Sequence, residues 1–193
     1  MWSADTNAPK NYDGATASMN VHTFAIGDLS RKGTRQIVAL SVDAAGHSRL
    51  SVLRGDGVVL SAYWHPGRLQ QIVIARRTAR HAPRIIVTGI NRDLKSLLNV
   101  NGPVSVVFML DPKKVRGEAP PYRGKLGSGS QLWYGFVLPS EQRIGRLEIV
   151  DHDNDGKRDI SLRTTAGRIF LDFDGKTLEA SHAHFELINP KHG

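Results

Sequence analysis

Short apolar segments alternate with polar turns along the chain, and this pattern predicts strands rather than helices. The segments RLEIV (146–150) and ISLRT (160–164) alternate apolar and polar side chains, as a strand with one covered face does. Similar segments flank residues 28–37 and 76–85. The 19 glycines and 9 prolines are spread over the sequence, which favours many turns over long helices. The chain is therefore expected to be all-β.

One arrangement of strands recurs along the sequence. Each copy has a strand, a polar loop, a strand, a hairpin, a strand, a tight turn and a final strand. The tight turns are clearest at Asp56-Gly57 and Asp174-Gly175, because Asp-Gly is a strong hairpin signal. Four antiparallel strands of this kind form one blade of a β-propeller. The pattern predicts one propeller-like domain over residues 21–182 with about three four-stranded blades, in units at 22–67, 68–142 and 143–182.

The middle unit is longer than the others because it carries additional segments. The first, INRDLKSLLNVNG (90–102), is predicted to form a short helical turn that uses Leu94, Leu97 and Leu98. The second, residues 110–131, is rich in glycine, proline and lysine and is predicted to be a long surface loop.

Three blades are too few to close a propeller, which normally needs at least four. We expect the chain to be part of a longer propeller, to complete itself as a homo-oligomer with another copy, or not to form a ring. A β-sandwich-like arrangement is the alternative fold. A polar N-terminal segment (1–20) and a C-terminal tail (183–193) are predicted to flank the domain.

The stretch DHDNDGKRDI (151–160) carries the clearest chemical signal. Asp151, Asp153 and Asp155 stand at alternate positions, and Asp159 follows a glycine that permits a sharp turn. Calcium takes six to eight oxygen ligands, and carboxylates this close repel one another without a cation. We expect these side chains and the Lys157 carbonyl to bind one structural calcium ion, with the Lys157 side chain in solvent. An acidic turn without an ion is the alternative.

A family resemblance follows from this loop. An EF-hand does not fit, because Leu162 stands where the last calcium ligand would be and strands replace the helices. The pattern D-x-D-x-D-G-x-x-D-I instead resembles the FG-GAP/VCBS-type β-propeller repeats of integrin-like and bacterial surface proteins. Residues 27–38 (GDLSRKGTRQIV) resemble the same repeat with fewer ligands. The resemblance, over about residues 22–181, implies blades whose first loop holds calcium.

The other two loops depart from that pattern. Lys32 stands where the third loop has Asp155, and we expect it to pair with Asp28 in place of an ion. The middle loop has no carboxylate and carries a basic cluster, which is a candidate anion-binding site on the same rim: Arg76, Arg77, Arg80 and Arg84. Arginines that are simply solvated are the alternative.

Aromatic pairs are further candidates for ligand contacts. Tyr63 and Trp64 end the first unit and could stack on a sugar or a base, or pack between blades instead. Trp133 and Tyr134 have the same two possibilities.

No catalytic constellation is recognisable. The chain lacks a G-x-S-x-G nucleophile context, a P-loop and a G-x-G-x-x-G motif. His182, His184 and Glu186 are a weak candidate group for a transition metal. His152 lies in the acidic loop at a non-ligand position and is expected to face solvent.

The charge balance is basic, with a formal net charge of +8 and a pI near 10.0. This raises the expectation of an anionic partner. The absence of cysteine excludes disulfides and thiol chemistry. No apolar run is long enough to span a membrane, and the N-terminus lacks the apolar stretch of a signal peptide.

These features predict a noncatalytic, extracytoplasmic (periplasmic or cell-surface) binding or scaffold module that recognises a protein or a glycan. A sensor domain of a membrane-anchored regulator is a variant of this hypothesis. A polysaccharide-acting enzyme would need carboxylates or histidines clustered outside the acidic loop. A nucleic-acid or other polyanion binder would use the four arginines and the lysines of residues 113–125, and its binding would weaken steeply with salt. Nucleic acid is the less favoured partner.

Overall fold

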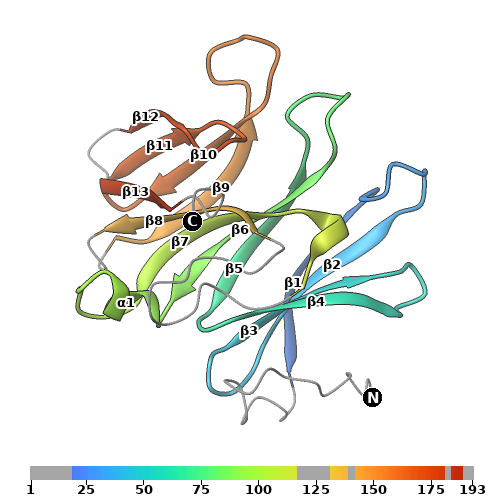
Figure 1. The fold of residues 1–193 in the computed structure, drawn as a ribbon, viewed down its shortest axis with the longest axis horizontal. Coiled ribbons are helices and arrows are strands. Elements are labelled where there is room, and N and C mark those ends of the chain that lie inside the picture. Colours follow the sequence, from blue (N-terminus) through green and yellow to red (C-terminus); the bar gives the residue numbers. More distant parts are fainter. Residues whose placement is uncertain (1–18, 117–130, 139–141, 181–183, 189–193) are drawn as a thin grey trace.

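The computed structural model describes residues 19–116, 131–138, 142–180 and 184–188, which form an almost purely β protein (Figure 1). These residues contain 13 strands in three antiparallel sheets, with a single turn of helix, α1 (Leu94–Leu97), and a 3-10 turn (Pro112–Lys114). The all-β prediction is confirmed. Within the described residues, no helix has the length and apolar character needed to cross a membrane.

The first sheet is built from four strands that follow one another in both sequence and space. Its order is β1 (Asn20–Gly27), β2 (Gln36–Val42), β3 (Ser48–Leu53) and β4 (Val59–His65). The last sheet repeats this plan with β9 (Ile144–Val150), β10 (Asp159–Thr164), β11 (Gly167–Leu171) and β12 (Thr177–Ala180).

The predicted Asp-Gly turns lie where the sequence placed them, between the third and fourth strands of these two sheets. Gly57 and Gly175 have φ values of 90° and 83°, which glycine adopts without strain. The N–H of Gly57 donates to the Arg54 carbonyl (2.9 Å), and the N–H of Gly175 donates to the Asp172 carbonyl (3.0 Å). The two hairpins therefore have the same turn geometry at the same place in the first and last sheets.

The middle sheet has five strands, where the repeat predicted four. Its order is β13 (His184–Ile188), β8 (Gln131–Leu138), β7 (Val104–Leu110), β6 (Arg84–Asn91) and β5 (Leu69–Ala75). Strand β13 comes from the predicted C-terminal tail and pairs antiparallel with β8. Alternation within one unit could not indicate that a strand from the chain's end returns to a different sheet.

The predicted helical turn is confirmed by α1. The side-chain oxygen of Asn91 accepts hydrogen bonds from the N–H groups of Asp93 (2.8 Å) and Leu94 (2.9 Å), which starts the turn. Leu94 is buried in the core and Leu98 packs against it. Of the predicted surface loop over 110–131, residues 117–130 lie outside the described part of the chain.

The sheets stack face to face, and each junction holds a hydrophobic core. Strand β1 contacts β5, and β5 contacts β9, so the first strands of the sheets lie side by side. The first core joins the first and middle sheets through residues that include Leu40, Leu50, Ile85, Val87 and Phe108. The second core joins the middle and last sheets through residues that include Ile86, Val107, Trp133, Leu147 and Ile160.

The joint between the first and middle sheets also holds a buried polar side chain, His65. Its ring stacks on Phe108 with centroids 5.4 Å apart, and its Nε2–H donates to the Ile90 carbonyl (3.0 Å). Burial lowers the pKa of His65 to about 3, so the ring is neutral at physiological pH. The backbone at Gly67 passes so close to the backbone at Ile90 that a Cβ added to Gly67 would lie 2.1 Å from the Ile90 carbonyl oxygen.

Candidate metal site

Three loops project from one end of the sheets, each joining the first two strands of its sheet (Figure 1). We call them the first loop (28–36), the second loop (76–84) and the third loop (151–159). The second loop is hydrogen-bonded to both others. The Arg76 guanidinium donates to the Asp28 carbonyl (3.2 Å), and the Arg158 N–H donates to the Arg77 carbonyl (2.8 Å). The loops therefore share one rim, as the repeat predicted.

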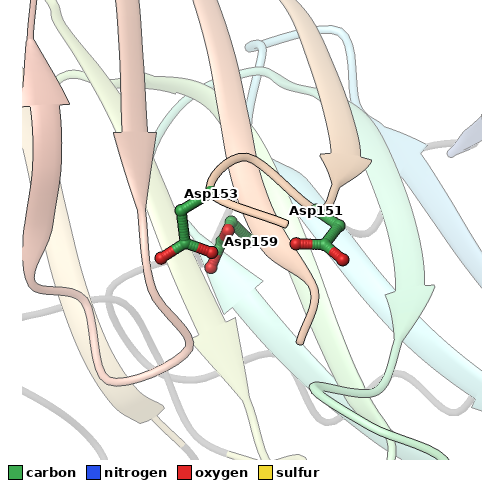
Figure 2. Close-up of side chains that lie close together, drawn as sticks. All are labelled: Asp151, Asp153 and Asp159. Carbon is green, nitrogen blue, oxygen red and sulfur yellow. The ribbon is translucent and has the colours of Figure 1, made fainter. Parts of the chain in front are cut away.

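Three carboxylates of the third loop converge. Asp151, Asp153 and Asp159 each place an oxygen within 4.8 Å of the others (Figure 2). Asp159 is buried at the start of β10, whereas Asp151 and Asp153 are exposed. The cluster contains oxygen ligands only, and this chemistry suits a hard cation. The described residues thus contain a group that could hold a metal ion.

Backbone hydrogen bonds fix the orientation of each of these carboxylates. Asp151 accepts from the Gly156 N–H (3.1 Å), Asp153 from the Asp155 N–H (3.2 Å) and Asp159 from the His152 N–H (3.0 Å). Each bond uses one oxygen: Oδ2 of Asp151, Oδ1 of Asp153 and Oδ2 of Asp159. Within the part of the chain that the structure describes, the other oxygen of each side chain has no hydrogen bond or ion pair and is available to a ligand. The arrangement therefore meets the first requirement of a cation site, which is several oriented and unshared oxygens.

Asp155 differs from its predicted role. The Asp155 carboxylate is not part of the converging group, because it accepts from the Lys157 ammonium and from the Lys157 N–H (2.7 Å). The Lys157 side chain is the first cause of the lowered pKa of Asp155. The Lys157 side chain is exposed, as predicted, but its ammonium also pairs with Asp155, because neighbours two residues apart can meet within so tight a loop.

His152 also departs from the prediction of a solvent-facing ring. It stacks on Phe170 with centroids 3.7 Å apart, and its Nε2 lies 3.1 Å from Glu179. The ring therefore attaches the third loop to the outer strands β11 and β12.

The first loop has nearly the same backbone geometry without the same ligands. The N–H of Leu29 donates to the Gln36 side chain (2.9 Å), as His152 donates to Asp159. The N–H of Gly33 donates to Asp28 (2.9 Å), as Gly156 donates to Asp151. Both loops also have positive φ at equivalent positions, in the pairs Arg31 and Asn154 (63° and 59°) and Gly33 and Gly156 (78° and 77°).

The predicted pairing of Lys32 with Asp28 takes a different form. The contact is made by the backbone N–H of Lys32, which lies 3.2 Å from the Asp28 carboxylate. No ion pair between the two side chains is found in the described residues. The first loop is therefore held by neutral amide donors rather than by a lysine that replaces an ion.

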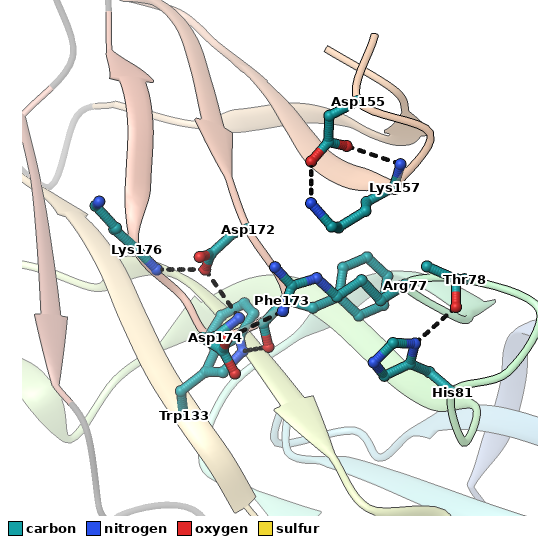
Figure 3. A network of polar contacts seen from close by, with 10 residues as sticks. All are labelled: Arg77, Thr78, His81, Trp133, Asp155, Lys157, Asp172, Phe173, Asp174 and Lys176. Carbon is teal, nitrogen blue, oxygen red and sulfur yellow. Dashed lines mark hydrogen bonds and ion pairs between the residues drawn. The ribbon is translucent and has the colours of Figure 1, made fainter. Parts of the chain in front are cut away.

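The arginines of the second loop do not gather at one point. Arg77 forms an ion pair with Asp174 (3.3 Å; Figure 3). The Arg84 guanidinium lies 3.8 Å from the Asp111 carboxylate. Arg80 is exposed, and its carbonyl accepts from the Arg31 guanidinium (3.1 Å). The predicted set of four is therefore dispersed over separate partners.

A different group of arginines lines a hollow between the second and third loops. The hollow has a volume of about 400 Å³ and is lined by Arg76, Arg77, Thr78, Ala79, Gly156 and Arg158. Sequence reasoning missed Arg158, because it belongs to the acidic loop and faces the second loop only in the fold. It also missed the pairing of Asp174 with Arg77, since the two residues are far apart in sequence.

The remaining sequence candidates are not assembled into a site. Tyr63 is fully buried and Trp64 is 7% exposed, with the Arg49 guanidinium 5.7 Å from the Trp64 ring centroid. Stacking of this pair on a ligand is therefore a wrong prediction, and packing between sheets is confirmed for Tyr63, which lies 5.4 Å from Phe108. Trp133 and Tyr134 are likewise buried. The side chains of His182, His184 and Glu186 lie outside the described part.

No family model, no curated protein and no solved structure matches the chain.

Proposed function

We propose that the chain is a noncatalytic, extracytoplasmic binding or scaffold module, built from three blades of a propeller-type repeat and stabilised by one calcium ion in the third loop. The repeated order of strands and the adjacency of β1, β5 and β9 support the blade arrangement. The resemblance of residues 151–160 to FG-GAP/VCBS-type loops supports it as well.

The converging oxygens of Asp151, Asp153 and Asp159 carry the calcium proposal. Carboxylates that repel one another gain most from a divalent cation with oxygen preference. Calcium suits the loop better than magnesium, because calcium accepts irregular oxygen shells whereas magnesium demands near-octahedral geometry and dehydrates reluctantly. The loop joins β9 to β10, so the ion would stiffen the inner hairpin of the last sheet.

A structural role for the ion follows from what surrounds the cluster. Asp159 and Asp151 are each tied to a loop amide, and the nearby Asp155 is paired with Lys157. These groups are occupied in holding the loop rather than placed as a free acid and base. The extracytoplasmic assignment rests on calcium supply, since extracellular modules bind calcium at the millimolar level found outside cells.

Calorimetry and thermal melting test the calcium proposal. We expect one calcium ion to bind per chain, to raise the melting temperature, and to be displaced by chelator, with magnesium giving a much smaller shift. Asp153→Asn should weaken binding, whereas Asp56→Asn in the first hairpin should leave it unchanged because Asp56 pairs with Arg54 far from the cluster. Equal melting temperatures with calcium and with chelator would contradict the proposal.

A polyanion-binding surface is the second candidate, and the hollow between the loops favours it. Arg76, Arg77 and Arg158 line it together with Thr78. Arg158 is exposed and, among the described residues, its side chain has no hydrogen bond or ion pair. Its guanidinium is thus available for a carboxylate or sulfate group of a glycan.

Binding to an acidic polysaccharide, polygalacturonate, tests this candidate. We expect affinity to fall with added salt and to fall further in Arg158→Ser. Arg163→Ser serves as the matched control, because Arg163 is an exposed arginine on the last sheet, away from the hollow. Absence of binding at low salt, or equal losses in both variants, would remove the polyanion candidate and leave the calcium proposal untouched.

A further inference from the structure

The hollow between the second and third loops is lined by three arginines and, among the described residues, by no acidic side chain. Arg76 and Arg77 belong to the second loop, and Arg158 belongs to the third. The N–H of Arg158 donates to the Arg77 carbonyl (2.8 Å), so these two side chains start from hydrogen-bonded backbones. Guanidiniums that line one space repel one another, and an anion bound among them would offset that repulsion.

Most hydrogen-bond donors of these arginines are unused in the described part of the chain, since a guanidinium has five N–H groups. Arg76 uses one, on the Asp28 carbonyl (3.2 Å). Arg77 uses one, on the Asp174 carboxylate (3.3 Å). The Arg158 side chain has no hydrogen bond or ion pair with any described residue. The hollow therefore has both the charge and the donors to bind an oxyanion.

The ion pair between Arg77 and Asp174 already places an anionic group on one of the three arginines (Figure 3). Asp174 stands in the Asp-Gly turn between β11 and β12, and its side chain is 72% exposed. An ion pair that is so exposed contributes little to stability. An external anion can therefore replace Asp174 on Arg77 without disturbing the fold.

The volume and the lining of the hollow indicate the kind of anion that it takes. Its volume of about 400 Å³ lies at the lower end of the range for ligand pockets, which suits a monosaccharide unit with its charged group. A carboxylate has two oxygens, whereas a phosphate or sulfate monoester has three terminal oxygens to share among three guanidiniums. No aromatic side chain is among the described residues that line the hollow, so a stacked nucleobase is not favoured.

We propose that the hollow binds a phosphate or sulfate monoester group of a sugar, and that Asp174 competes with this group for Arg77. This assignment rests on the polyanion-binding function, to which it adds the class of ligand and a residue that regulates affinity. The three arginines hold the terminal oxygens of the monoester, and Asp174 returns to Arg77 when the sugar leaves.

Nuclear magnetic resonance titrations of the full chain with three matched sugars test the ligand class. Glucose 6-phosphate, glucose 6-sulfate and glucuronate have the same ring and differ in the anionic group at its end. We expect the Gly156 and Arg158 amide signals to shift, with a Kd for the better monoester about fivefold or more below that for glucuronate. The better monoester identifies the source as a phosphorylated or a sulfated sugar. One ionic strength and a buffer freed of calcium by a chelating resin keep the third loop in one state.

Single substitutions test the competition and the site. Asp174→Asn should raise the affinity for the better monoester about threefold, because it removes an exposed competitor. Asp56→Asn is the matched control: it changes the net charge equally at the corresponding turn of the first sheet, where Asp56 pairs with Arg54, and should leave the affinity unchanged. Arg158→Ser should lower the affinity about tenfold, whereas Arg163→Ser should not.

The possible results distinguish a failure of the ligand class or of the competition from a failure of the hollow as a binding site. Equal affinities for glucuronate and both monoesters would overturn the ligand class. Asp174→Asn that binds no more tightly than Asp56→Asn, or that still gains affinity when Arg77→Gln is also present, would overturn the competition for Arg77. The polyanion-binding surface would stand in each of these cases. No shift with any of the three sugars, or equal losses in Arg158→Ser and Arg163→Ser, would remove the hollow as an anion site altogether.

Discussion

The first and third loops have one backbone geometry and two different sets of side chains. Both have an Asp at the first position, positive φ at the fourth and sixth positions, and a side chain at the ninth position that accepts the second N–H. The third loop places Asp153 and Asp159 where the first loop has Ser30 and Gln36. Only the third loop therefore brings carboxylates together.

This comparison separates the shape of the loop from its capacity for a metal. The first loop keeps its shape through hydrogen bonds to Asp28, Ser30 and Gln36, among which Asp28 is the only carboxylate. The shape consequently needs no cation. The acidic residues of the third loop are then surplus to folding, and their mutual repulsion argues for a ligand.

Giving the third loop the side chains of the first loop should have the largest effect on the stability that calcium adds. Asp153→Ser/Asp159→Gln retains a hydrogen-bond acceptor at each position, as the first loop shows, but removes two carboxylates from the cluster. Calcium at 100 times its Kd stabilises the wild type by about 2.7 kcal/mol, and this gain should disappear. Chemical denaturation with and without calcium measures it. A variant that unfolds in calcium-free buffer would show instead that the two loops are not interchangeable.

Giving the first loop the side chains of the third loop should add a smaller, calcium-dependent gain in stability. Ser30→Asp/Gln36→Asp places three carboxylates on the frame of the first loop, with Asp28 as the third. We expect calorimetry to detect a second calcium ion, weaker than the first because Arg31 and Lys32 stand within this loop. At ten times the Kd of that site, the added stability would be about 1.4 kcal/mol. An unchanged stoichiometry of one would mean that the ligand set needs more than these positions.

Glycine substitutions compare the two backbones directly. Gly33 and Gly156 have φ of +78° and +77°, and an added Cβ on either would meet no atom within 4 Å. Gly33→Ala and Gly156→Ala should therefore each destabilise the calcium-free protein by about 1 kcal/mol, through backbone strain alone. Gly55→Ala is the control, because Gly55 lacks a positive φ and an added Cβ there would meet only the Arg35 carbonyl, at an ordinary contact distance of 3.9 Å. If Gly33→Ala and Gly156→Ala lower the free energy of unfolding by clearly different amounts, the two loops differ in backbone strain.

The parts that the sequence predicted well depend on local patterns. Alternation located the strands, and the Asp-Gly pairs located the hairpins at Gly57 and Gly175, because each needs only neighbouring residues. Asp151, Asp153 and Asp159 could be predicted for the same reason, since a short loop confines them. The failures have an equally physical cause. Asp155 lies outside the cluster and pairs with the Lys157 ammonium, and a spacing rule does not weigh such competition.

Features that join distant segments were not predictable from one unit. The β8–β13 pairing joins strands that are far apart in sequence within the middle sheet. The contact of Arg77 with Asp174 and the hollow beside Arg158 join loops of different sheets. The sequence left open whether Tyr63 stacks on a ligand or packs between blades. The fold decides for packing, because the ring is fully buried and lies 5.4 Å from Phe108 of the middle sheet. Alternation alone does not give the order in which the sheets stack.

The smallest expected effect concerns the pH dependence of the first loop. Hydrogen bonds, first of all from the Gly33 N–H, lower the pKa of Asp28 below its usual 3.8. A carboxyl whose pKa is lower in the folded state stabilises the protein above pH 3.8, and this contribution is lost as the pH falls through the folded pKa. The melting temperature of Asp28→Asn should therefore lie slightly below that of the wild type at neutral pH, and the gap should narrow in acid.

Buried His65 also lowers the stability of the wild type and of Asp28→Asn as the pH falls. The unfolded chain takes up a proton at His65 below pH 6.5, whereas the folded ring resists protonation down to about pH 3. That contribution is common to wild type and variant, so it cancels in the difference between their melting temperatures. The quantity to follow is thus the difference between the two melting temperatures at each pH, rather than the melting temperature of either protein alone. A gap that stays constant from neutral pH to pH 3 would contradict the role of the Asp28 carboxylate, and would assign the loop's shape to its glycine and its ninth-position side chain instead.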